Sequence, residues 1–104
     1  MEPAHITVTR RDHRDVQDRQ VIVSLDGQKI ATLLFGDEAT RAVPPGHHRL
    51  RVHNTLFWKT FDLDLKPGDH ARFRVSNRAM AGITSLLGLL GSAPLSLVVE
   101  REGD

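Results

Sequence analysis

Short segments in which apolar and polar residues alternate run through most of this chain. A period of two is typical of β-strands that bury one face and expose the other. Two of these segments follow a Pro-Gly turn, at residues 45–46 and at residues 67–68. Proline presets φ for such a turn, and glycine accepts the positive φ of the next position. The strands that we expect cover residues 5–10, 19–25, 28–35, 39–43, 47–53, 56–65, 70–76 and 95–102.

Turn signals separate these segments at short intervals. Asp26-Gly27 between two alternating segments predicts a hairpin, and Pro44 ends the strand before it because proline cannot donate to a sheet. Residues 11–17 are charged and aperiodic, so we expect a solvated loop there. The predicted fold is all-β, a single immunoglobulin-like β-sandwich domain over residues 1–104, with seven to eight short antiparallel strands.

Residues 79–94 are strongly apolar but do not alternate. The leucines have partly helical spacing, and three glycines weaken a helix, so we expect a short helical or irregular insertion before the last strand. Three interpretations stay open: a cap on one open end of the sandwich, a docking surface for a protein partner or a second copy of the chain, and insertion into a membrane interface. The residues expected to form the docking surface are Ile83, Leu86, Leu87, Leu89 and Leu90.

Charge and composition narrow the possible partners. Fourteen basic and thirteen acidic residues give a net charge of +1, which argues against a general nucleic-acid binder. The chain has no cysteine, which excludes disulfides and cysteine-ligated metals. No apolar stretch reaches the roughly 18 residues that a membrane-spanning helix needs. The first residues lack the basic start and apolar core of a signal peptide, so we expect a cytoplasmic location.

Two strands carry basic residues on their polar face. His47, Arg49, Arg51 and His53 share one face of the first, and His70, Arg72 and Arg74 share one face of the second. Together with Trp58, the residues His47, Arg49, Arg51, Arg72 and Arg74 form a candidate surface for phosphate, an acidic glycan or nucleic acid.

The same residues also fit a ladder of cross-strand charge pairs. If the three strands between residues 47 and 76 form a meander, Asp62 and Asp64 lie between the two basic rows. A two-residue turn at residues 54–55 would place Arg51 opposite Trp58, with Arg49 opposite Thr60 and His47 opposite Asp62. On the other side, Asp62 would face Arg72, and Asp64 would face His70. If the strand at residues 47–53 lies in the other sheet instead, Arg49 and Arg51 are not paired with Asp62 and Asp64.

Catalysis and metal binding have little support in the residue pattern. The six histidines lack the spacing of a helical zinc motif, and adjacent His47 and His48 point to opposite faces of a strand. We expect solvated or edge histidines. Nucleophile motifs and phosphate-binding glycine loops are absent from the sequence. We therefore expect no enzyme activity, no metal and no cofactor.

Residues 21–52 resemble the PEGA-type domains and related bacterial β-sandwich families. The matching pieces are Val21-Ile22-Val23-Ser24-Leu25-Asp26-Gly27 and Val43-Pro44-Pro45-Gly46-His47-His48-Arg49-Leu50-Arg51-Val52. The resemblance implies a β-sandwich that serves as a non-catalytic accessory or surface-interaction module. It transfers no catalytic residues.

Overall fold

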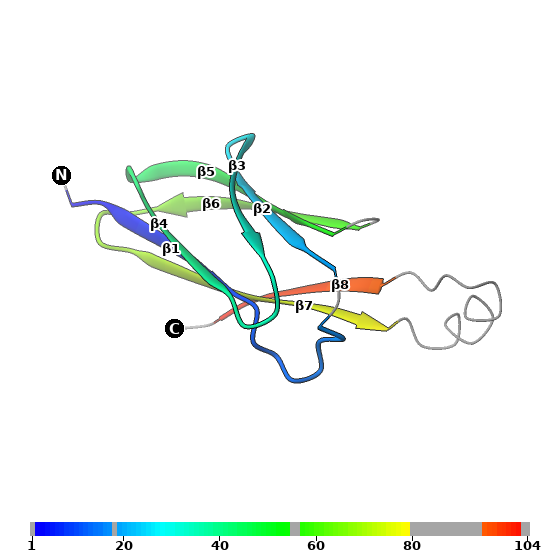
Figure 1. The fold of residues 1–104 in the computed structure, drawn as a ribbon. Coiled ribbons are helices and arrows are strands. Elements are labelled where there is room, and N and C mark those ends of the chain that lie inside the picture. The colour runs from blue at the N-terminus through cyan, green and yellow to red at the C-terminus, as the bar shows by residue number, and fades with distance from the viewer. Residues whose placement is uncertain (1, 18, 55–56, 80–94, 103–104) are drawn as a thin grey trace.

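The chain folds into two four-stranded sheets that pack face to face (Figure 1). The structure is a computed structural model that describes residues 2–17, 19–54, 57–79 and 95–102. Its strands are β1 (Ala4–Thr9), β2 (Val21–Leu25), β3 (Gln28–Leu33), β4 (Glu38–Val43), β5 (Gly46–His53), β6 (Trp58–Leu65), β7 (His70–Ala79) and β8 (Leu95–Arg101). The described residues contain no helix, and none of them forms an element that would span a bilayer as a helix. The all-β sandwich predicted from alternation is confirmed.

One sheet is mixed, which corrects the prediction that all strands pair antiparallel. The strand orders are β4-β1-β7-β8 and β3-β2-β5-β6, and β1 runs parallel to β7. The chain leaves β6 through the turn at Pro67-Gly68 and enters the opposite sheet. There it meets the start of β1, because the Gly68 amide donates to the Pro3 carbonyl and the His5 amide to the Asp69 carbonyl. Both strands start at this end, so they run in the same direction.

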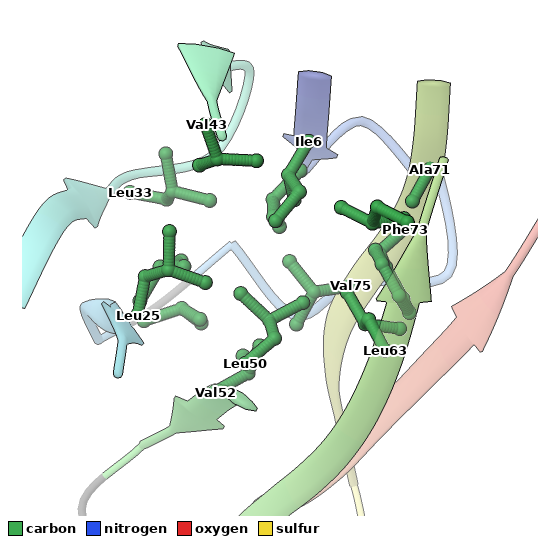
Figure 2. Packing of buried hydrophobic residues seen from close by; sticks show 14 of the residues in the cluster. Ile6, Leu25, Leu33, Val43, Leu50, Val52, Leu63, Ala71, Phe73 and Val75 are labelled. Carbon is green, nitrogen blue, oxygen red and sulfur yellow. The ribbon is translucent and has the colours of Figure 1, made fainter. Parts of the chain in front are cut away.

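The core lies between the inner faces of the two sheets, where the apolar residues of the alternating segments meet (Figure 2). Leu50 and Val52 of β5 pack there with Phe73 and Val75 of β7, and all four are fully buried. Burial of each such side chain is worth about 1.5–3 kcal/mol. The predicted inward positions of these two strands are therefore confirmed, although the strands belong to different sheets.

The loop at residues 11–17 is exposed at five of its seven positions, as its charges predict, but Asp12 and Asp15 are buried. Arg10 is 0 % exposed, and its Nε donates to Asp15 Oδ2 at 2.9 Å. An Arg10 Nη donates to the Leu33 carbonyl at 2.9 Å, and the Asn77 amide donates to Asp15. The loop thus crosses the end of the sandwich and links β3 to β7 through a buried ion pair.

Candidate functional site: the outer face of β5 and β6

The outer face of the β5–β6 hairpin carries most of the polar residues that the sequence singles out. Its Cα partners are His47 with Asp64, Arg49 with Asp62, Arg51 with Thr60, and His53 with Trp58. This register differs from the predicted one by two residues. The connection is longer than a two-residue turn, because the Asn54 amide donates to the Phe57 carbonyl and the Phe57 amide to the Asn54 side chain.

Charge pairs occupy the half of this face that is far from the connection. Arg49 Nε lies 3.1 Å from Asp62 Oδ1, and His47 Nδ1 lies 3.1 Å from Asp64 Oδ1. All four side chains are more than half exposed, so each pair contributes about 0.2–1 kcal/mol and mainly helps to set the register. The charge ladder is confirmed between β5 and β6, with new partners. It is wrong for β7, because that strand lies in the other sheet.

An exposed aromatic ring dominates the other half of the face. Trp58 is 61 % exposed, and the guanidinium carbon of Arg51 lies 5.6 Å from its ring centroid. A cation–π contact at such an exposed site is worth about 0.5–1 kcal/mol. The predicted contact between Arg51 and Trp58 is confirmed, but along a diagonal instead of directly across the hairpin. Arg51 forms no ion pair with any described residue.

A hollow of about 450 Å³ lies at the ends of β2 and β5, where it is lined by His53, the cross-strand partner of Trp58. Ile22, His53 and Trp58 form one row across β2, β5 and β6. His53 lines the hollow, and its Nδ1 is buried without a hydrogen-bond partner in the part of the chain that the structure describes. We call Ile22, Arg51, His53 and Trp58 the Trp58 surface. It offers an aromatic ring and a cation to a ligand. The remaining residues that line the hollow are Arg19, Gln20 and Asn54.

The second predicted basic row lies on the outer face of the other sheet. Arg74 pairs with Glu100 at 3.1 Å, and Arg72 donates to His70 Nδ1 at 3.1 Å. Since a guanidinium only donates, His70 Nδ1 accepts, and its Nε2–H donates to Thr7 Oγ1 at 2.7 Å. Burial and the neighbouring Arg72 lower the pKa of His70, in keeping with this neutral ring. Arg72 and Arg74 are therefore separated from His47, Arg49, Arg51 and Trp58 by the thickness of the sandwich.

His48 is a mostly buried histidine that the expectation of solvated histidines missed. Its side chain is 11 % exposed, its Nδ1 lies 2.7 Å from Asp26 Oδ2, and its Nε2 lies 2.6 Å from the Pro44 carbonyl oxygen. Both neighbours accept, so the ring is doubly protonated. The hydrogen bond to Asp26 raises the pKa of His48, and the same bond lowers the pKa of Asp26. The burial of His48 could have been predicted from the sequence, because alternation places residue 48 on the inner face of the strand with Leu50.

The predicted docking residues Ile83, Leu86, Leu87, Leu89 and Leu90 lie outside the described residues, as does the rest of the predicted insertion after Ala79. Within the described ranges, no three metal-binding side chains gather at one point. The chemistry that the described surface offers is stacking, charge pairing and hydrogen bonding.

No protein-family model, curated protein or solved structure matches this chain. Its function is therefore inferred from the chemistry of the surface alone.

Proposed function

We propose that the protein is a non-catalytic interaction domain that docks a protein partner, and that the Trp58 surface belongs to the docking site. One observation carries the proposal: Trp58 is 61 % exposed and has Arg51 stacked on its ring. Tryptophan and arginine are the residue types that most often dominate the energy of protein interfaces. An exposed tryptophan on a sheet contributes little to the core beneath it, whereas a partner would bury it.

The charges around Trp58 favour a partner with an acidic side chain next to an apolar one. Arg49 and His47 already have Asp62 and Asp64 as neighbours. Arg51 forms no such pair among the described residues, so an incoming carboxylate meets a positive charge beside an aromatic ring. A two-fold dimer through the Trp58 surface would present the same side chains from both copies, and this set contains a cation but no carboxylate. The missing acidic group favours a different protein over a second copy.

The apolar segment extends the proposal to a second docking element. Its members would be Ile83, Leu86, Leu87, Leu89 and Leu90, which follow β7 in the sequence. Changing Leu86 and Leu90 to serine tests this element separately from the Trp58 surface. Unchanged partner capture by that double variant would leave the cap or the membrane interface as the role of the segment.

We also propose that the sandwich is immunoglobulin-like in the broad sense and related to the PEGA-type domains. The β2–β3 hairpin, the short β4 and the Pro-Gly turn before β5 support this proposal. Such a relationship would imply the same non-catalytic binding role.

The proposal is tested by capture from native lysate, with wild-type protein and Trp58→Ala as baits and mass spectrometry as the readout. Leu34→Ala is the matched control, because Leu34 is 55 % exposed in a loop outside the Trp58 surface. We expect a protein that the wild type and Leu34→Ala enrich and Trp58→Ala does not. The enriched protein is then purified and its affinity measured with Arg51→Ala, which should weaken binding as well. Equal recoveries from all baits would contradict the proposal.

Anion binding remains a second candidate function because Arg51 and Arg72 have no carboxylate partner within the described ranges. They lie on opposite faces of the sandwich, so neither face has a dense basic patch. Retention on heparin above physiological salt, lost in Arg51→Ala, would favour this candidate over a protein partner.

A further inference from the structure

The outer face of the β3-β2-β5-β6 sheet continues past the Trp58 surface to Lys29 on β3. In this sheet β2 runs between β3 and β5 (Figure 1). Ser24 of β2 has Lys29 as its Cα partner on one side and Arg51 on the other. Directly opposed residues of neighbouring strands share one face of a sheet. Lys29 and Arg51 therefore stand on either side of Ser24, two strand spacings or roughly 10 Å apart.

A β-bulge is the reason that Lys29 lies on the outer face. The register of β2 against β3 shifts just before Ser24, so that Ile30 is an extra residue between the partners of β2. Strict alternation from the buried Leu33 would give Lys29 the inward direction of Ala31. Bulges re-aim side chains, and this one moves a cation from the core side of an edge strand to the exposed sheet face.

The described residues neutralise neither of these two cations. Lys29 is exposed and forms no ion pair or hydrogen bond within the described ranges. Arg51 has its cation–π contact with Trp58 and no ion pair there. The two aspartates of β6 on this face already pair with Arg49 and His47. The row that runs from Lys29 through Ser24 to Arg51 thus carries two positive charges and no carboxylate.

A less polar row runs beside this charged row. It passes from Ile22 through its cross-strand partner His53 to Trp58. Ile22 and Ser24 are two residues apart on β2, so the two rows lie about 7 Å from each other. Ile22 is partly exposed and Trp58 is mostly exposed, so a ligand that covers them buries apolar area. The face therefore offers a cationic line of contact next to an apolar one.

We propose that this double row binds an acidic segment of the protein partner, with one carboxylate on Lys29 and another on Arg51. An apolar side chain of the segment then packs on Ile22 and Trp58. The inference rests on the proposed function, and it adds Lys29 and Ser24 to the docking site. The Ser24 hydroxyl stands between the two cations and can donate a hydrogen bond to a carboxylate.

The charges and rings of this face favour a protein segment over a nucleic acid. Two separate cations match two carboxylates of one segment, whereas a single carboxylate leaves one cation uncompensated. Sites for single-stranded nucleic acid stack successive bases on several aromatic side chains. The double row has one indole ring, and the net charge of the whole chain is only +1.

The test is a titration of the isotope-labelled full chain with capped tetrapeptides, followed by amide chemical shifts. The diacid is Glu-Leu-Leu-Glu, whose glutamates are about 10 Å apart in an extended chain. Each of two monoacids has one glutamate replaced by glutamine. We expect saturable shifts at Ser24, and binding of the diacid about two to five times tighter than of the monoacids, as for an exposed ion pair.

Two variants assign this preference to its cation. In Lys29→Gln the diacid should lose its advantage over the monoacids. Lys66→Gln is the matched control, because it removes the same charge from an exposed residue at the end of β6 opposite Trp58. This control should keep the preference for the diacid. An unchanged preference in Lys29→Gln, or an equal loss in Lys66→Gln, would overturn the role of Lys29.

Further outcomes separate this inference from the proposed function. A folded wild type without saturable shifts would overturn the acidic segment, whereas capture of a partner that depends on Trp58 would still support the docking domain. Loss of diacid binding in Trp58→Ala, together with an unchanged preference in Lys29→Gln, would restrict the site to the Trp58 surface and overturn its extension. Tighter binding of tetrathymidylate than of the diacid would overturn the peptide in favour of a nucleic acid.

Discussion

Replacing Arg10 with methionine should be among the most damaging single changes in this protein. Arg10 is fully buried, and it donates to Asp15, to the Leu33 carbonyl and, at 2.6 Å, to the Arg19 carbonyl. Methionine keeps much of the side-chain volume but removes the charge and the donors. The Asp15 side chain is 0 % exposed, so its carboxylate would stay buried without the cation that it pairs with.

The expected loss follows from that burial. Breaking a buried ion pair by removing one partner costs about 3–5 kcal/mol, because the other charge stays buried. A domain of this size has a total stability of about 5–15 kcal/mol, so the change removes a large share of it. Arg11→Met is the matched control. Arg11 pairs with Glu38 at 3.2 Å, but its side chain is 60 % exposed, so its loss should cost at most about 1 kcal/mol.

The assay is urea unfolding followed by far-ultraviolet circular dichroism, because the exposed Trp58 is a poor reporter of the core. Asp15→Asn and the double variant complete a mutant cycle, in which we expect a coupling energy near the upper end of the usual range of about 0.5–3 kcal/mol. The double variant should not recover fully, because the Leu33 carbonyl also loses a donor. A loss for Arg10→Met no larger than that for Arg11→Met would refute the reasoning.

Two other predictions concern turns. The raised pKa of His48 means that its stabilisation is complete below its ordinary value of 6.5 and is lost as the pH rises through the raised value. Urea midpoints should therefore fall over this interval in the wild type and in His13→Gln, whose side chain is 94 % exposed, but not in His48→Gln; equal declines in all three would contradict the doubly protonated ring. Gly27→Ala should cost about 1 kcal/mol, because φ is +84° there and no atom lies within 4 Å of the new Cβ. Calorimetry should show a melting temperature about 4–8 °C lower, and an unchanged value would count against strain at this turn.

Local alternation was enough to predict the strands and their buried faces, because a half-buried strand repeats every two residues. Leu50 and Phe73 therefore lie in the core as predicted. Alternation could not predict which of the two sheets contains β7. A Pro-Gly turn fits both a return beside β6 and a crossover to the opposite sheet, and only the contacts of β7 with β1 separate the two.

In the candidate site too, contacts within one hairpin were predictable, whereas contacts between residues far apart in the sequence were not. Arg51 and Trp58 were predicted to meet because both point outward on neighbouring strands. The hollow next to His53 is also lined by Ile22 from another strand, so no short segment of the sequence reveals it. Arg10 and Asp15 were missed for a related reason: their burial needs Leu33 and Asn77, which are distant in the sequence.

The edge strands indicate which kind of contact a partner makes. An unpaired strand edge can accept a strand from another chain, and an inward-pointing charge at the edge opposes such pairing. Arg41 on β4 and Lys59 on β6 have the same direction as the buried Val43 and Leu63, and Arg101 on β8 has its guanidinium carbon 5.7 Å from the Phe73 ring centroid. A strand added to any of these edges would place its apolar face near a cation. Recognition through a sheet face avoids that conflict, and Trp58 supplies a large aromatic contact on such a face. Partner binding should therefore depend on Trp58 and not on the backbones of β4, β6 and β8.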